Sequence, residues 1–296
     1  MHIPDGFIDL DVAAIFYVLT LAVLGYSLYK VRKEDVNLSL LGIVAAGIFA
    51  AQMLNWPIPG GTSAHLVAGA LAGILLGPYA GSLAMASVLT IQCLIFADGG
   101  VTALGANIWN MGVVDVFVGY YIYKVLKGKN EYLASFIGGW LGITMAAMFA
   151  GVEVGLSSSF KYGITTTVPV MGLWHGILGI VEGIITAAVV GYIHTTRPDI
   201  MERAGEVKVG KITWAVLGLL ILLSPLFAYA AEAVGYSEPL ENVAEMLGAE
   251  EHTIYEGLLP DYTVPGMDPY IGTLISGIVG VGIVLLLGVG ISRVHK

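Results

Sequence analysis

Nine apolar stretches follow one another along the chain and constrain its fold more than any other feature. They are residues 12–31, 38–54, 65–76, 79–97, 108–126, 132–154, 170–194, 212–231 and 270–291. Crossing the roughly 30 Å hydrocarbon core of a bilayer takes about 20 helical residues, and every stretch except 65–76 comes close to that length. Because main-chain polar groups find no water inside a bilayer, such a segment spans it as a helix. The sequence therefore predicts an all-α polytopic membrane protein with about nine transmembrane helices.

Composition supports a membrane protein and excludes several other classes. Of the 296 residues, 57% are hydrophobic and 12% are charged, whereas about a quarter are charged in an average soluble domain. The net charge of −9 disfavours a nucleic-acid partner. The single cysteine, Cys93, rules out a disulfide framework or a cysteine-based zinc site. No basic region precedes the first apolar stretch, so we expect a retained span there and not a signal peptide.

Basic residues predict how the chain lies in the membrane, because loops that face the cytoplasm are enriched in Lys and Arg. With the N-terminus outside and nine crossings, only Lys161 lies on the outer side. The remaining basic residues would face the cytoplasm: Lys30, Arg32, Lys33, Lys124, Lys127, Lys129, Arg197, Arg203, Lys208, Lys211, Arg293 and Lys296. If 65–76 did not cross, the basic residues would be divided between the two sides of the membrane. This stretch is therefore predicted to cross fully and to end at Gly77 and Pro78. We expect a multi-pass protein of the cell membrane with a cytoplasmic C-terminus.

A change in composition divides the chain into two units. Residues 195–211 are polar and charged, and we expect them to form a cytoplasmic linker. Residues 1–194 hold the first seven spans, and residues 212–296 hold two more around an external loop, 232–269. That loop carries nine acidic residues and no Lys or Arg. The apolar spacing within 241–247 predicts a short amphipathic helix there.

The first residues bring metal-binding groups together before any span begins. If Met1 is retained, its amine, the amide nitrogen of His2 and the His2 ring nitrogen nearer the backbone can close two fused chelate rings around one ion. Nitrogens in a plane suit Ni(II) and Cu(II), whereas Mg and Ca prefer oxygen and Zn prefers a tetrahedron. The bulk of His2 favours retention of Met1, and the carboxylate of Asp5 follows closely. The alternative is that His2 is simply a solvated terminal residue.

His65 is the natural fourth ligand, because the predicted topology puts it on the same side of the membrane as His2. It follows a loop rich in glycine and proline, and Thr62 or Ser63 is predicted to cap the helix that begins there. The alternative is that His65 only hydrogen-bonds its own loop. With His2 on the same side, the metal site is favoured.

Three polar residues are candidates to orient the ligands without binding the ion. Asp98, Asn107 and Asn110 lie in and just after a second glycine-rich external loop. Irregular backbone of this kind is tolerated at membrane depth where it lines a cavity, and such residues can hold ligating imidazoles in place. Ordinary loop and capping roles explain them equally well.

Two ionisable residues occupy the seventh span. His175 and Glu182 are seven residues apart and therefore share one face of a helix. Ionisable residues in a span usually face the bundle interior, so they are predicted to pair with each other, with Asp115 or with Glu153. We expect structural or supporting roles, because two more ligands would spoil a plane of four nitrogens.

Small residues recur at every fourth position in two stripes, a spacing that lets helices approach closely in lipid. The first stripe is Gly42, Ala46 and Ala50, and the second is Gly69, Gly73, Gly77 and Gly81. Packing within the chain is the default for both. One of them is alternatively a surface for a partner subunit.

Missing motifs narrow the function further. The sequence has no P-loop, no H-E-x-x-H motif and no evident Ser or Cys nucleophile motif. It also lacks the dense Asp, Glu and His relay of a proton-coupled pump. We therefore predict a protein that is not an enzyme and that needs a separate motor for uptake. A metal-binding protein or sensor without transport is the alternative, and a metalloenzyme would require an open coordination position.

Several short motifs occur in order between residues 1 and 194. They are Met-His-Ile-Pro-Asp-Gly at the start, Gly-Thr-Ser-Ala-His-Leu ending at Leu66, Leu-Gly-Pro ending at Pro78, Phe-Ala-Asp-Gly-Gly ending at Gly100, Ala-Leu-Gly-Ala-Asn ending at Asn107, and Asn-Met-Gly ending at Gly112. Together they resemble the CbiM/NikM family, the substrate-capturing S components of energy-coupling factor (ECF) transporters for cobalt and nickel. The resemblance implies that Met1, His2 and His65 hold Ni(II) or Co(II) in a square plane. It implies no cofactor beyond the transported ion.

The resemblance also implies partners, namely a membrane T component and two cytoplasmic ATPases. The first small-residue stripe would then suit the T-component contact, and the S component would topple in the membrane to release its ion inward. Residues 212–296 resemble the CbiN/NikN-like auxiliary subunit fused in many members, although Ser237 to Glu241 depart from its usual Pro-Asp-Gly-Leu-Glu motif. The sequence Thr-Ser-Ala-His-Leu at His65 is closer to nickel-type members, and a cobalt-specific subunit is the alternative.

Overall fold

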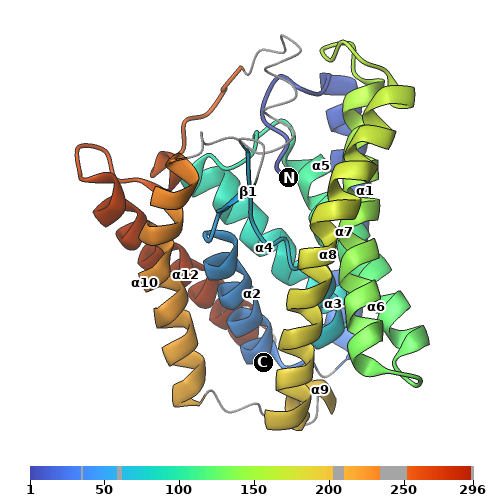
Figure 1. Cartoon of the computed structure of the whole chain (residues 1–296), viewed down its shortest axis with the longest axis vertical. Helices are drawn as coiled ribbons and strands as arrows, with labels where there is room; N and C mark the ends of the chain where they lie inside the picture. Colours follow the sequence, from blue (N-terminus) through green and yellow to red (C-terminus); the bar gives the residue numbers. More distant parts are fainter. Residues whose placement is uncertain (35, 59–61, 203–209, 234–251, 295–296) are drawn as a thin grey trace.

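The computed structural model describes residues 1–34, 36–58, 62–202, 210–233 and 252–294, and these are almost entirely helical (Figure 1). The helices are α1 (Leu10–Lys33), α2 (Leu38–Gln52), α3 (Gly69–Leu76), α4 (Pro78–Phe96), α5 (Leu104–Asn107), the π-helical η1 (Ile108–Val114), α6 (Asp115–Leu126), α7 (Glu131–Leu156), α8 (Ile164–Thr196), α9 (Pro198–Glu202), α10 (Lys211–Glu232), the 3₁₀ turn η2 (Pro260–Tyr262) and α12 (Pro269–Val294). A short antiparallel hairpin pairs β1 (Trp56–Ile58) with β2 (Thr62–Ala64). The predicted all-α fold is confirmed.

Six of the described helices are long and apolar enough to cross a membrane, namely α1, α4, α7, α8, α10 and α12. Of the other three predicted spans, two are shorter helices and the third is made of two consecutive helices. Helix α2 has 15 residues and α3 has 8. The stretch 108–126 is covered by η1 and α6. The predicted number of about nine spans is therefore approximate.

The stretch 65–76 departs most from its prediction. It is helical only from Gly69, because Ala68 adopts a left-handed conformation with φ 62°. Thr62 and Ser63 lie in β2, so the prediction that one of them caps this helix is wrong. At about 1.5 Å per residue, α3 is only about 12 Å long, which is much less than the thickness of a bilayer core. This stretch therefore does not cross as one helix.

Glycines allow α3 to lie deep in the bundle. Gly77 ends α3 with φ 86°, and Pro78 occupies the first turn of α4, as the predicted break required. A Cβ atom on Gly73 would lie 2.5 Å from the carbonyl oxygen of Val116 on α6. The second small-residue stripe therefore serves packing within the chain.

The first stripe is also covered by the chain itself. Gly42, Ala46 and Ala50 are buried on α2, which packs against α12. A Cβ atom on Gly42 would lie 3.2 Å from the Cα atom of Gly288 on α12. Helices α10 and α12 of the C-terminal unit stand beside α2 on one flank of the bundle (Figure 1). The structure thus places this stripe against α12 and not on a free face for a partner subunit.

The two ends of the bundle carry different features. The N-terminus, the β1–β2 hairpin and the chain leading from residue 252 to α12 lie at one end (Figure 1). Helix α1 finishes with Lys30, Arg32 and Lys33 toward the opposite end, where α9 and the turn between α6 and α7 also lie. The predicted amphipathic helix at 241–247 and residues 203–209 of the predicted linker lie outside the described residues.

Candidate metal centre

The first residues run into the bundle instead of lying on its surface. Met1 and His2 have only 6% and 3% of their surface exposed, and Ile3 and Phe7 are buried. Burial of apolar side chains of this size contributes about 1.5–3 kcal/mol each. The apolar residues that flank His2 therefore hold it inside the protein, and His2 is not a solvated terminal residue.

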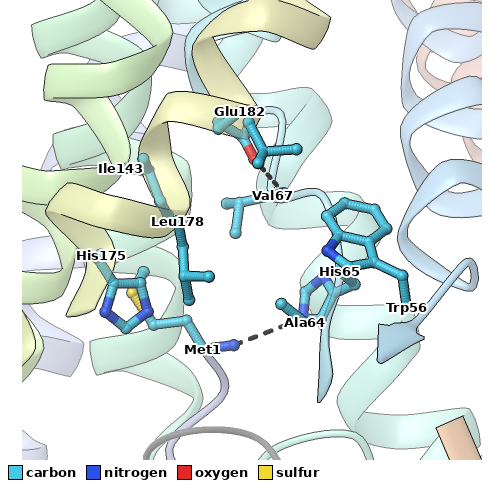
Figure 2. A pocket seen from close by; sticks show the side chains of 10 residues that line it. Met1, Trp56, Ala64, His65, Val67, Ile143, His175, Leu178 and Glu182 are labelled. Atoms are coloured by element: carbon cyan, nitrogen blue, oxygen red, sulfur yellow. Dashed lines mark hydrogen bonds between the residues drawn. The ribbon is translucent and has the colours of Figure 1, made fainter. Parts of the chain in front are cut away.

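The terminal amine faces His65. The nitrogen of Met1 lies 3.4 Å from Nε2 of His65 (Figure 2). Nδ1 of His65 lies 2.9 Å from the carbonyl oxygen of Leu66. Two nitrogens bound to one ion at about 2 Å each are at most about 4 Å apart. The amine and Nε2 are therefore close enough to bind the same ion.

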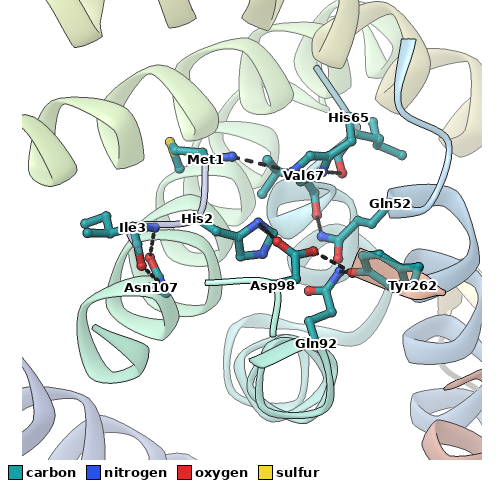
Figure 3. Close-up of polar contacts among 11 residues, drawn as sticks. Met1, His2, Ile3, Gln52, His65, Val67, Gln92, Asp98, Asn107 and Tyr262 are labelled. Carbon is teal, nitrogen blue, oxygen red and sulfur yellow. Dashed lines mark hydrogen bonds and ion pairs between the residues drawn. The ribbon is translucent and has the colours of Figure 1, made fainter. Parts of the chain in front are cut away.

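His2 completes the group of nitrogens. Its ring centroid lies 5.3 Å from that of His65, with 19° between the two ring planes. Its Nδ1 atom lies 3.0 Å from Oδ1 of Asp98 (Figure 3). Nδ1 is the ring nitrogen of the predicted chelate, so an ion bound there would replace the contact with Asp98. Metal binding of this kind releases the proton that the ring nitrogen carries.

Asn107 fixes the backbone next to the chelating residues. Its Oδ1 atom accepts a hydrogen bond from the Ile3 amide at 2.8 Å, and its Nδ2 atom donates to the Ile3 carbonyl oxygen at 3.1 Å. The Gly100 amide donates to the same carbonyl at 2.9 Å. Asn107, predicted to orient the site, thus contacts the main chain of Ile3.

Asp5 closes the N-terminal turn. Its Oδ1 atom accepts from the Thr102 amide at 2.8 Å and from the Thr102 hydroxyl. The main-chain carbonyl of Asp5 accepts from the amide of His252 at 3.2 Å. The site is therefore bounded by three segments that are far apart in the sequence.

The His65 segment is held from α8. The carboxylate of Glu182 accepts hydrogen bonds from the amides of Val67 and Ala68, at 3.0 and 2.6 Å. Gln52 on α2 donates to the Val67 carbonyl oxygen at 2.7 Å. These bonds satisfy the irregular backbone that a bilayer would otherwise leave without partners. Glu182 therefore supports the segment that follows His65, a more specific role than the sequence indicated.

A small cavity of about 40 Å³ lies between the amine and Glu182 (Figure 2). It is lined by Met1, Trp56, Ala64, His65, Val67, Ile143, His175, Leu178, Val181 and Glu182. His175 contributes one wall, and its Nδ1 atom lies 3.1 Å from the carbonyl oxygen of Met171 one turn earlier. His175 and Glu182 thus face one cavity, as their spacing predicted.

Asn110 lies elsewhere. On the π-helical segment η1, its Nδ2 atom donates to Oε2 of Glu153 at 2.7 Å, and both side chains are buried. Asp115 packs where α3 begins, against Gly69. Asn110 is therefore bonded to Glu153 of α7 and not to the imidazoles, and Glu153 partners Asn110 and not His175 or Glu182.

Tyr262 is a residue of the site that the sequence did not indicate. Its hydroxyl donates to Oδ2 of Asp98, which comes 164 positions earlier. Gln92 donates to the Tyr262 hydroxyl oxygen at 3.0 Å (Figure 3). No local pattern around Tyr262 indicates this contact, because it forms only when the C-terminal unit folds onto α4.

Acidic side chains lie close to the N-terminal residues, with Asp98 3.0 Å from His2. Burial, and then the neighbouring charge of Asp98, raises the pKa of the Asp261 carboxyl. Among the described residues, no three His, Cys, Asp or Glu side chains are grouped so that they could hold a metal ion. The Met1 nitrogen, 3.4 Å from Nε2 of His65, is a further possible donor beside the two imidazoles.

Comparison with known proteins assigns both units. Residues 2–200 match the family described as "CbiM: Cobalt uptake substrate-specific transmembrane region", and residues 211–296 match the PDGLE domain. The chain belongs to the CbiM family. It is accordingly a membrane component of metal-ion transport and carries a fused PDGLE domain. The resemblance to the CbiM/NikM family is confirmed.

Relatives of this CbiM-family chain share its whole length. It is 66% identical to "Putative fused nickel transport protein NikMN" of Archaeoglobus fulgidus, over 99% of this chain and 98% of the relative. It is 30% identical to "Fused nickel transport protein NikMN" of Rhodobacter capsulatus, over 99% of this chain and 97% of that one. A solved structure titled "Crystal Structure of an Truncated Transition metal Transporter" matches with a TM-score of 0.60 and 37% identity, covering 66% of this chain and 99% of the other.

Proposed function

We propose that this chain is the substrate-binding S component of an ECF-type importer and that it captures Ni(II) or Co(II) through the Met1 amine, His2 and His65. The observation that carries the proposal is the 3.4 Å separation between the Met1 nitrogen and Nε2 of His65. The amine, the His2 amide and two imidazole nitrogens make a set of four nitrogens, which suits a planar ion. The ion is the cargo, and the protein needs no other cofactor.

In the capture step, the nitrogen ligands exchange their protons and hydrogen-bond partners for the ion. His2 gives up its contact with Asp98, and the ring and amide protons leave as the ion arrives. Asp98 and Asp5 remain close and offset the positive charge of the bound ion. The neighbouring cavity, with His175 and Glu182 on its walls, gives the ion or its displaced water a first space inside the bundle.

Nickel is the proposed cargo. Two relatives that share almost the whole chain are named as nickel transport proteins. A relative named "Putative cobalt transport protein CbiM" from Methanococcus voltae is 32% identical and matches 71% of this chain. Planar nitrogen coordination also favours Ni(II).

The proposed orientation puts the metal centre outside and the C-terminus in the cytoplasm. It is supported by the basic residues at the end of α1, opposite the N-terminus, because cytoplasmic ends are enriched in Lys and Arg. Capture from outside would then be coupled to a T component and two ATPases. Their contact surface is not the stripe on α2, because α12 already covers it.

Titration of the purified protein with Ni(II) in a calorimeter tests the ligand set. We expect His2→Ala and His65→Ala each to abolish tight binding, because each removes a nitrogen that no other residue replaces. His194→Ala is the matched control, since His194 pairs with Glu131 at the opposite end. Unchanged affinity in His65→Ala would refute the assignment.

A membrane protein that binds metal without transporting it is the second candidate, because the metal centre by itself does not require a motor. Vesicles that contain this chain with a T component and ATPases decide between the two. ATP-dependent accumulation of Ni(II) supports the importer. Binding without accumulation supports the alternative.

A further inference from the structure

A chain of polar contacts joins the C-terminal unit to His2. Tyr262 donates to Oδ2 of Asp98, and Oδ1 of the same carboxylate lies 3.0 Å from Nδ1 of His2 (Figure 3). Both oxygens of Asp98 are therefore engaged, one by the metal centre and one by the C-terminal unit. A carboxylate held from both sides is fixed in position.

The direction of these bonds is set by Gln92. Its side-chain amide donates to the Tyr262 oxygen at 3.0 Å, so the hydroxyl proton is directed to Asp98. The ring of Tyr262 stacks on Phe96, with 4.6 Å between centroids and 13° between planes. Gln92 and Phe96 are both fully buried on α4. Tyr262 is thus held by contacts that do not depend on the metal centre.

The backbone around Tyr262 is strained in a way that serves this contact. Asp261 and Tyr262 both have positive φ, 51° and 57°, although neither is glycine. Such conformations persist only where the surrounding structure holds them, and they concentrate at functional sites. Just before them, the amides of Leu258 and Leu259 donate to the carbonyl oxygen of Ile95, at 2.9 and 2.7 Å.

We propose that Tyr262 is a positioning residue for the metal centre and acts on His2 through Asp98. This inference rests on the proposed function, because it assigns a role to the same ligands. In the metal-free protein Asp98 contacts Nδ1, the ring nitrogen that would bind the ion, and so orients the ring. Once the ion has replaced that contact, the nearby carboxylate offsets part of its positive charge. Tyr262 keeps that carboxylate in place before the ion arrives. The fused C-terminal unit therefore supplies part of the metal centre, and affinity depends on it.

Tyr262→Phe removes only the hydroxyl and keeps the ring that stacks on Phe96. We expect Ni(II) affinity to fall about tenfold, the lower end of the range for residues that support a ligand. The visible absorption band of bound Ni(II) should keep its position, because the four nitrogens that bind the ion are unchanged. Tyr270→Phe is the matched control, since Tyr270 belongs to the same unit and donates to Glu232 instead.

A double-mutant cycle shows whether Tyr262 acts through Asp98. In an Asp98→Ala background, Tyr262→Phe should change Ni(II) affinity less than twofold, because the carboxylate through which Tyr262 acts on His2 is absent. Wild-type Ni(II) affinity in Tyr262→Phe would overturn the inference. A tenfold loss that persists in the Asp98→Ala background would overturn it too.

Different results refute the proposed function and the inference about Tyr262. If wild-type protein does not bind Ni(II), or if His65→Ala binds it normally, the ligand set is wrong and the role of Tyr262 falls with it. If wild-type binding requires His65 but Tyr262→Phe and Tyr270→Phe are both normal, only the inference about Tyr262 is wrong.

Discussion

Replacing Glu182 by glutamine tests how the irregular segment 65–68, which carries His65, is held. The carboxylate accepts from the amides of Val67 and Ala68 at 3.0 and 2.6 Å, and both residues are buried. Glutamine offers one oxygen and turns an NH₂ group toward the second amide. One buried donor then loses its partner, which costs about 2 kcal/mol. If this segment relaxes in the metal-free protein, the cost appears in binding as a Ni(II) affinity about 30-fold lower.

Two measurements together detect the lost hydrogen bond, whether it lowers Ni(II) affinity or the stability of the metal-free protein. Calorimetry with Ni(II) reports the part carried by binding, and thermal unfolding in detergent without metal reports the part carried by the metal-free fold. Glu131→Gln is the matched control, because Glu131 bonds Tyr123 and His194 at the opposite end. The reasoning is refuted if Glu182→Gln matches wild type in both Ni(II) affinity and unfolding temperature.

Three further outcomes follow from the same contacts. One uncleaved residue added before Met1 should abolish the planar Ni(II) spectrum, because it turns the amine into an amide and moves the new amine by about 3.8 Å; a tagged protein that keeps the spectrum contradicts this. Ni(II) affinity should fall as the pH is lowered from about 8 to about 5, since protons compete for the amine and imidazoles, and a flat calorimetric profile contradicts it. Asp9 accepts from Ser159 and Ser158, hydrogen bonds that lower the pKa of its carboxyl to about 2. Its stabilising effect is therefore complete above the usual value of 3.8 and is lost as the pH falls toward about 2, so Asp9→Asn should unfold at a lower temperature than wild type at pH 6 and at an equal one near pH 2.

The spans were predictable because hydropathy and main-chain hydrogen bonding act locally. A run of about 20 apolar residues must be helical in lipid wherever it lies in the fold. The exception is instructive. Residues 65–68 belong to an apolar stretch yet are not helical, and Glu182 and Gln52 satisfy backbone groups there from two other helices.

The candidate ligands were also visible in the sequence. Met1 and His2 form their chelate within two residues, so adjacency along the chain is enough to suggest it. His65 required one further step, the charge pattern that predicts it on the same side. Asp98 and Asn107 were named for their loop, and the structure places both within hydrogen-bonding distance of residues 2 and 3.

By itself, then, the sequence predicted most of the helices, a division into two units and the candidate metal ligands, because each prediction depends on composition and short spacing. Only the tertiary structure decided what holds those residues. Glu182 reaches Val67 across 115 positions and Tyr262 reaches Asp98 across 164, and the stripe at Gly42 meets α12 and not another subunit. Such contacts are absent from any local pattern, because they exist only once packing has brought distant helices within a few ångströms.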